Sequence, residues 1–188
     1  MKKLTTAALA ALALTAIIPT SAFADDPVTP KQGAVCNLYL LDVHEDDKGF
    51  SETAATLATK PAAATFVDTA SDFKPVEKRN DVKTSWGMWD GWFKQEKAGT
   101  YTFTCKRYDR KDCRYSIWIN GQQCAKAWYG QGSFDVELSA GFNSVKIVAE
   151  GYTNYKSAPL TISYKKKGSV KEPVSFGPES MFYDDDDE

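Results

Sequence analysis

The sequence predicts an all-β fold, an antiparallel sandwich or barrel. Hydrophobic and polar residues alternate over several short runs after residue 82, as in strands with one buried face. Turn residues separate these runs, among them Asn120-Gly121, the pair that best suits a two-residue hairpin loop. With 188 residues, 13% of them aromatic, and a net charge of only −2, the chain suits one globular domain rather than a disordered polymer.

The N-terminus has the features of a secretory signal peptide over residues 1–24. Lys2 and Lys3 precede an uncharged apolar stretch of about 15 residues, shorter than the ~20 that span a bilayer. Ser-Ala-Phe-Ala at 21–24 then fits a cleavage site. We therefore expect an exported protein, periplasmic or secreted to the cell surface, with no transmembrane span in the mature chain.

The mature chain is expected to comprise a polar leader at 25–34, one domain at 35–183 and an acidic tail at 184–188. Removal of Lys2 and Lys3 takes the net charge from −2 to −4, and the five carboxylates of the tail leave the body at +1. A nearly neutral body lacks the basic footprint of a nucleic-acid-binding protein. The tail is expected to be solvated and disordered.

Strands are expected in order along the domain. The run at 35–43 is apolar, 65–68 suits a short strand, and 52–59 suits one or two helical turns. An aromatic-rich, glycine-interrupted stretch from Trp86 to Lys94 is expected to pack in the core. The clearest alternation defines the remaining strands, at 100–105, 115–119, 133–138, 144–149 and 160–165.

Export leads us to expect disulfides among the four cysteines, for which three pairings exist. If the strands at 100–105 and 115–119 form a hairpin, Cys105 and Cys113 lie on the same side of its mouth. A cross-strand bridge there would close the loop at 106–112, and Cys36 would pair with Cys124 by elimination. A zinc site is disfavoured because the sequence lacks a Cys-x-x-Cys pair and has a single histidine.

The order of motifs from 86 to 183 resembles the PA-fourteen (PA14) domain, named after the N-terminal part of anthrax protective antigen. The resemblance rests on Trp-Asp-Gly-Trp-Phe at 89–93, Ala-Gly-Thr-Tyr-Thr-Phe at 98–103 and Ile-Trp-Ile-Asn-Gly at 117–121. Val-Glu-Leu-Ser-Ala-Gly at 136–141 and Pro-Glu-Ser-Met-Phe-Tyr at 178–183 continue it. The resemblance implies a β-sandwich. It also implies a carbohydrate ligand, since many members are sugar-binding modules of adhesins.

The calcium mechanism of that family does not transfer to this chain. Its sugar-binding members hold calcium with two adjacent aspartates in the loop between the first two core strands. The corresponding loop at 106–112 carries Asp109 and Asp112, which are not adjacent, and four cationic residues that disfavour a further cation. We therefore expect no cofactor and no metal site, and calcium in particular is disfavoured.

Aromatic residues are the main candidates for ligand contact. Alternation turns Trp118 away from the face that carries Tyr115, so that it either offers a stacking platform or is covered by a second sheet. The remaining candidates lie in or beside polar connections, where binding residues concentrate. They are Tyr108, Asp109, Asp112, Trp128, Tyr129, Tyr152 and Tyr155.

These features indicate a non-catalytic binding module. The first hypothesis is glycan recognition at the cell surface or in the periplasm. The alternative is an accessory subunit that contacts another exported protein, as in an adhesin or a toxin. An enzymatic or glycosidase-associated role is disfavoured, because the sequence has no Gly-x-Ser-x-Gly, His-Glu-x-x-His or phosphate-loop motif and singles out no pair of carboxylates for glycoside hydrolysis.

Overall fold

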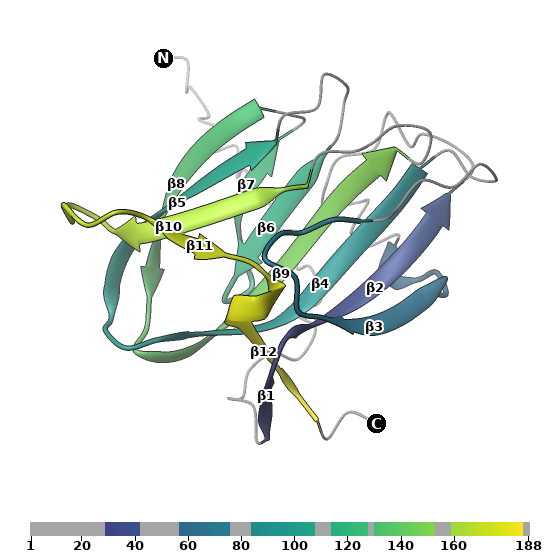
Figure 1. The fold of residues 1–188 in the computed structure, drawn as a ribbon, viewed down its shortest axis with the longest axis horizontal. Coiled ribbons are helices and arrows are strands. Elements are labelled where there is room, and N and C mark those ends of the chain that lie inside the picture. Colours follow the sequence, from purple (N-terminus) through teal and green to yellow (C-terminus); the bar gives the residue numbers. More distant parts are fainter. Residues whose placement is uncertain are drawn as a thin grey trace, which may run out of the picture.

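The computed structural model describes residues 29–41, 57–75, 84–107, 114–127, 130–152 and 159–185. Within these residues the chain forms twelve strands in two antiparallel sheets, together with the 3₁₀-turn η1 (Pro178–Ser180) (Figure 1). Buried side chains from both sheets share one core. The predicted all-β sandwich is therefore confirmed.

The larger sheet consists of β1 (Pro30–Gln32), β2 (Ala34–Leu41), β3 (Ala64–Asp68), β4 (Thr84–Gln95), β6 (Tyr115–Ile119), β7 (Gln122–Ala127), β9 (Gly141–Tyr152) and β12 (Met181–Asp184). Six of them follow the order β1-β12-β4-β9-β6-β7. The pair β2-β3 joins the same sheet through β4. Thus β2 and β12 both lie along one edge of β4, each over a different part of its length.

The smaller sheet consists of β5 (Gly99–Arg107), β8 (Gly130–Leu138), β10 (Thr161–Lys166) and β11 (Val174–Phe176). Its order is β11-β10-β5-β8. Because β5 pairs with β8 and β10 while β6 pairs with β7 and β9, the connection from β5 to β6 crosses between the sheets. The hairpin considered for these two sequence neighbours is therefore wrong.

The turn between β6 and β7 is set by its own residues. Asn120 and Gly121 have φ values of 50° and 74°, the left-handed region that a two-residue type I′ loop requires. Asn120 also ties the turn to β9, since its backbone N–H donates to Ser144 O (2.9 Å) and its Oδ1 accepts from Ser144 N (3.0 Å). The hairpin predicted from Asn-Gly is confirmed.

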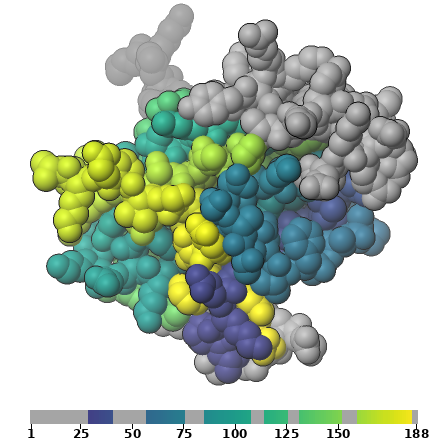
Figure 2. Space-filling view, in the orientation of Figure 1, coloured from purple at the N-terminus to yellow at the C-terminus, as the bar shows by residue number. Residues whose placement is uncertain are grey.

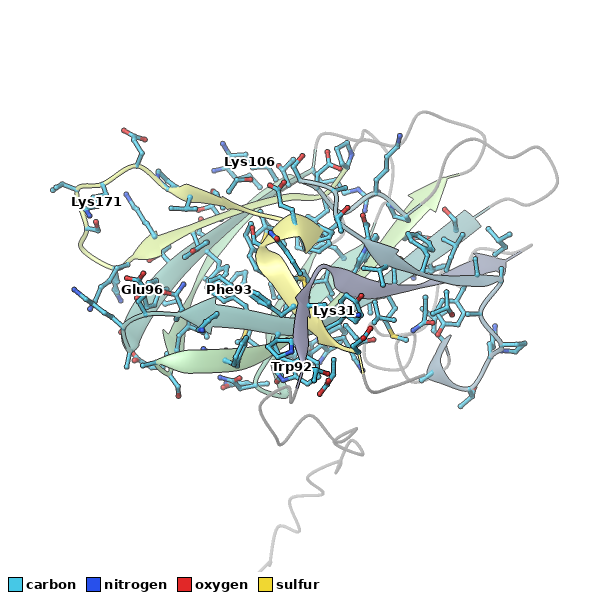
Figure 3. The ribbon with its side chains drawn as sticks, turned by 60° about the horizontal axis from the view of Figure 1, so that its bottom comes forward. Lys31, Trp92, Phe93, Glu96, Lys106 and Lys171 are labelled. Carbon is cyan, nitrogen blue, oxygen red and sulfur yellow. The ribbon has the colours of Figure 1, made fainter. Side chains whose placement is uncertain are left out.

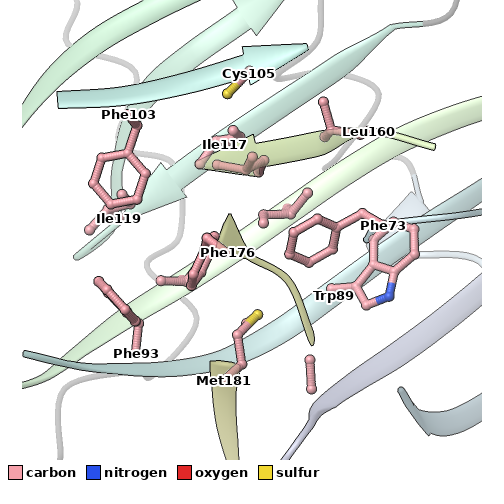
Figure 4. Close-up of a cluster of buried hydrophobic side chains, with 14 of the residues drawn as sticks. Phe73, Trp89, Phe93, Phe103, Cys105, Ile117, Ile119, Leu160, Phe176 and Met181 are labelled. Carbon is pink, nitrogen blue, oxygen red and sulfur yellow. The ribbon is translucent and has the colours of Figure 1, made fainter. Parts of the chain in front are cut away.

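The main core lies between the sheets and is rich in aromatic rings (Figure 4). The ring centroid of Phe93 lies 6.4 Å from that of Phe103 and 4.9 Å from that of Phe176, both in edge-to-face contact. The ring of Trp89 lies directly over Gly87, where a Cβ atom would come within 2.3 Å of it. The glycine that interrupts the aromatic stretch therefore makes room for a fully buried tryptophan.

A second cluster lies on the outer face of the larger sheet, turned away from the smaller sheet. It consists of Tyr39, Leu57, Trp86, Met88, Trp118 and Val148, with Ala62 packed against it. Leu57 is buried although it comes from the segment between β2 and β3. This segment thus covers part of the outer face and completes a small core there.

Both ends of the domain differ from the predicted boundaries. Residues 30–34 were expected in a polar leader, but 30–32 form β1 and Ala34 begins β2, and β1 pairs with β12 near the other end of the chain. Asp184 ends β12, and Asp185 forms an ion pair with Lys31. The first two residues of the predicted acidic tail therefore belong to the fold. The predicted signal peptide and residues 186–188 lie outside the described residues.

Candidate functional site

The predicted ligand residues follow strand ends that the structure brings to one end of the sandwich. The register pairs Arg107 at the end of β5 with Gly130 at the start of β8, and Tyr115 at the start of β6 with Ala127 at the end of β7. At the same end, β10 begins opposite β5 and β9 ends opposite the start of β4. We call this the connection end, because the connections 108–113, 128–129 and 153–158 start and finish there.

Most of the predicted contact residues themselves lie outside the described residues. This applies to Tyr108, Asp109, Asp112, Trp128, Tyr129 and Tyr155, and also to the side chain of Tyr152, the last residue of β9. The strand ends that flank these residues do lie together at the connection end. Their role as ligand contacts stays a prediction.

Beneath the connection end lies a buried ion pair that links two of its strands. Arg114 directly follows the connection 108–113, and Glu150 is two residues from the end of β9. Arg114 Nε lies 2.9 Å from Glu150 Oε2, and Arg114 Nη2 lies 3.3 Å from Oε1. Both side chains are almost fully buried, at 2% and 0% exposed. The guanidinium also stands 5.1 Å from the ring centroid of Trp86, a cation–π contact.

This pair adds a second fixed link to the backbone ladder. The Glu150 N–H donates to Arg114 O (2.8 Å), so the two residues are joined through main chain and side chain together. A bidentate guanidinium–carboxylate pair holds one relative orientation, since both groups are planar. Sequence reasoning missed the pair, because nothing local indicates that two charged residues 36 positions apart meet in the interior.

Trp118 is not a stacking platform for a ligand. Its side chain does face away from Tyr115, as alternation predicts, but it is only 9% exposed. It packs in the outer cluster with Trp86, Met88 and Leu57, on the face of the larger sheet that is turned away from the second sheet. Both expectations for this residue are therefore wrong, because the chain between β2 and β3 supplies the cover.

The Cys36–Cys124 disulfide is wrong as well. Cys36 lies on β2 and Cys124 on β7, four strand-to-strand steps apart through β4, β9 and β6. At 4.7–4.9 Å per step this amounts to about 19 Å, whereas bridged cysteines have Cα atoms about 4.4–6.8 Å apart. Both residues carry free thiols in the structure.

The Cys105–Cys113 bridge loses its basis in the same way. It assumed a hairpin between β5 and β6, and these strands belong to different sheets. Cys105 carries a free thiol and is buried in the main core. Cys113 lies outside the described residues. The expectation of a disulfide-stabilised fold thus finds no support among the described cysteines.

Alkylation of the folded chain tests this assignment. Burial raises the pKa of Cys36, with Asp68 and Asp90 adding to the shift, and burial raises the pKa of Cys105 to about 12. Because the thiolate is the reactive species, iodoacetamide at neutral pH should modify neither residue. Burial raises the pKa of Cys124 as well, but its thiol is only half-buried, so it should react before Cys36 and Cys105. Unfolding without reductant and a second label should then reveal Cys36 and Cys105 as free thiols by peptide mass spectrometry. A peptide that links Cys36 to Cys124 would contradict the assignment.

Among the described residues of the chain, no three His, Cys, Asp or Glu side chains come together in a way that could hold a metal ion. The same residues contain no helix with the length and apolar composition needed to cross a bilayer.

Comparison with known proteins identifies the fold. No protein-family model and no curated protein sequence matches the chain. Among solved structures, the PA14 sugar-binding domain from an RTX adhesin has a TM-score of 0.54 at 22% identity, covering 80% of this chain and 97% of that one. The PA14 domain of the MpAFP antifreeze protein has a TM-score of 0.59 at 19% identity, covering 85% and 96%.

A yeast adhesin extends the same likeness. The epithelial adhesin 6 A domain from Candida glabrata, solved in complex with Galβ1-3GlcNAc, has a TM-score of 0.55 at 16% identity, covering 84% of this chain and 89% of that one. At these identities the likeness establishes architecture rather than ligand. From its motif order, its sheet topology and these structures together, the chain has the PA14-like antiparallel β-sandwich fold.

Proposed function

We propose that this protein is an exported, non-catalytic carbohydrate-binding module of the adhesin type. The observation that carries the proposal is its fold. The same architecture occurs in a domain described as sugar-binding and in yeast adhesin domains solved with Galβ1-3GlcNAc. Function does not follow from fold alone, so the proposal also needs a place on this chain where a sugar would bind.

The connection end is the place that we propose. Three connections start and finish there, each with an aromatic residue and one of them, 108–113, with two aspartates, and binding residues concentrate in such connections on a rigid scaffold. The buried Arg114–Glu150 pair beneath them supplies rigidity to two of the flanking strands. In this proposal Tyr108, Trp128 and Tyr155 contact the sugar ring, and Asp109 and Asp112 accept hydrogen bonds from its hydroxyl groups.

Export is part of the proposal. The signal-peptide features of residues 1–24 and an adhesin-type fold are consistent with a protein that meets glycans outside the cytoplasm. We therefore propose a periplasmic, secreted or cell-surface location.

Glycan binding by the full chain, measured on a glycan array and then by calorimetry, tests the function. We expect saturable binding of Galβ1-3GlcNAc or of another glycan on the array, unchanged by a calcium chelator. Trp128→Ala and Tyr155→Ala should each weaken binding by at least about tenfold, the effect of removing about 1.4 kcal/mol of contact energy. Val174→Ala, at an exposed position of β11 in the smaller sheet, is the matched control and should bind as the unmodified chain does.

Two outcomes would contradict the proposal in different ways. Full binding by the Trp128 and Tyr155 variants would remove the connection end as the site. The absence of binding to every glycan, together with co-purification of another exported protein, would favour the accessory-subunit alternative.

A further inference from the structure

A cavity on the outer side of the larger sheet is separate from the connection end. Its volume is about 490 Å³, within the range of small-molecule sites. Its floor is the stretch of β4 around Gly91, between Asp90 and Trp92. Asp90 is six residues along β4 from Thr84, which lies at the connection end, so about 20 Å separates the two places. We call this cavity the β4 groove.

The β4 groove arises because two strands share one edge of β4. β2 pairs with β4 as far as Asp90, and β12 pairs with it from Trp92 onward. Near Gly91, which lies between Asp90 and Trp92, β2 and β12 would both need the same edge of β4. The ribbon formed by β1 and β12 therefore diverges from β2 there. Figures 1 and 2 show this ribbon standing out from the body of the molecule below β3. One wall is formed by β2 and β3, the other by the end of β12.

One aromatic ring and two valines supply the apolar part of the lining. Trp92 lies on the side of β4 opposite to the core residue Phe93 and contributes to the groove, whereas Phe93 points between the sheets (Figure 3). Val35 on β2 and Val67 on β3, which pair with each other and lie on the same side as Asp90, line the opposite wall, and Val67 is 44% exposed. Trp92 and Val67 thus give the groove an apolar surface beside its polar groups, as small-molecule sites have.

Polar groups in the β4 groove are held in place by partners of their own. Asn37 Oδ1 accepts from the Thr65 hydroxyl (2.7 Å), which directs the N–H groups of the amide away from Thr65. Asp184 Oδ1 accepts from the Thr29 N–H (3.2 Å) and hydroxyl (2.9 Å). Prepositioned donors and acceptors of this kind fix the orientation of a ligand without the cost of ordering them on binding.

Two of the three carboxylates that line the groove form ion pairs with neighbouring lysines. Lys146 Nζ lies 3.3 Å from Asp90 Oδ1, and Lys31 forms an ion pair with Asp185. Burial raises the pKa of Asp90 and the nearby Lys146 opposes this shift. A free anion would meet three carboxylates and is disfavoured. A metal ion is disfavoured as well, because these carboxylates do not converge among the described residues.

We propose that the β4 groove is a binding site for a neutral saccharide unit. A sugar ring has a C–H face that suits Trp92, with Val67 across the groove, and hydroxyl groups that suit Asn37, Asp90 and Asp184. The groove lies outside the connection end, and the proposal does not depend on binding there. In a chain with both sites, two saccharide units of one glycan, or two glycans, would bind at places about 20 Å apart.

Nuclear magnetic resonance of the full chain tests the proposal, because tryptophan indole N–H signals report on each place separately. Trp92 reports on the β4 groove, Trp128 on the connection end, and fully buried Trp89 serves as an internal control. The signals are assigned with single Trp→Phe variants. The probes are methyl glycosides of glucose, galactose, mannose and N-acetylglucosamine, and Galβ1-3GlcNAc.

We expect at least one probe to shift the Trp92 indole and Asn37 side-chain amide signals saturably, with the Trp89 signal unchanged. Asp90→Asn should weaken this binding by about tenfold, because the amide removes one acceptor and the charge while keeping the shape. Trp92→Phe retains a ring and should weaken it less. Val174→Ala on the opposite sheet should bind normally, and thermal unfolding of each variant shows whether it is folded.

Other outcomes overturn the proposal. Sugar-dependent shifts confined to Trp128 would support the connection end alone. Shifts at Trp92 produced by calcium chloride or by an oligolysine peptide, but by none of the sugars, would assign the groove to a cation or to a basic protein segment. If no probe moves the Trp92 signal, the groove is not a saccharide site, whatever happens at Trp128.

Discussion

Replacement of Glu150 with alanine is expected to lower the free energy of unfolding by about 3–5 kcal/mol. The substitution removes the carboxylate that forms the bidentate pair with Arg114 and leaves a guanidinium that is 2% exposed in the interior. A buried charge that loses its counter-charge costs more than the lost attraction, because it has given up its hydration. Urea unfolding followed by tryptophan fluorescence measures the effect. Binding at the connection end should weaken too, since the pair joins two of its strands.

Two further variants separate charge from packing at this position. Arg114→Met combined with Glu150→Leu replaces the pair by apolar groups of similar volume and should restore most of the lost stability. Glu172→Ala removes an exposed glutamate and should change stability by less than about 0.5 kcal/mol. If Glu150→Ala were as mild as Glu172→Ala, the buried ion pair would not exist in solution.

Replacement of Trp89 with alanine is expected to cost about 3–5 kcal/mol, by loss of a large buried ring and creation of a cavity. The ring is fully buried and meets Phe73 edge-to-face, with centroids 5.4 Å apart. Its Nε1 also donates to Asp68 Oδ2 (2.7 Å), which connects β4 to the end of β3. The substitution should therefore lower the free energy of unfolding and also weaken the attachment of β3 to the sheet. Urea unfolding and amide hydrogen exchange of β3 measure the two effects.

Trp89→Phe distinguishes the ring from its hydrogen bond. The phenylalanine keeps most of the apolar contact and loses the donor to Asp68, so we expect a smaller cost of about 1.5–3 kcal/mol, typical of a hydrogen bond to a charged group. Phe66→Ala, which truncates an aromatic residue that is 44% exposed, is the surface control and should have little effect on stability. Equal losses in Trp89→Ala and Phe66→Ala would contradict the assignment of Trp89 to the core.

Much of the fold could be predicted because its signals are local. Alternation identified β5, β6, β8, β9 and β10 to within a few residues, and Asn120-Gly121 predicted the β6-β7 turn. The aromatic stretch of β4 was expected in the core; Trp89 and Phe93 lie in the main core and Trp86 in the outer cluster, whereas Trp92 lines the β4 groove. Such patterns depend on the period of a strand and on the φ values that a residue tolerates, and neither needs knowledge of distant partners.

The errors all concern partners that lie far apart in the sequence. β1 was placed in a leader because the strand with which it pairs, β12, lies about 150 residues later in the chain. The disulfide prediction failed because it assigned Cys105 and Cys113 to one hairpin, whereas β5 and β6 lie in different sheets. Trp118 was placed on the correct face, but what covers that face depends on the path of the chain between β2 and β3.

The sequence by itself thus determined an all-β sandwich, the face on which each strand residue lies, and the resemblance to PA14 domains. Only the tertiary structure decided which of these faces are covered, where Arg114 meets Glu150, and that β2 and β12 share one edge of β4 and so form a groove. The physical reason is that strand periodicity is a property of neighbouring residues. The order of the strands, and the segments that cover each face of a sheet, instead depend on the burial of apolar surface over the whole chain.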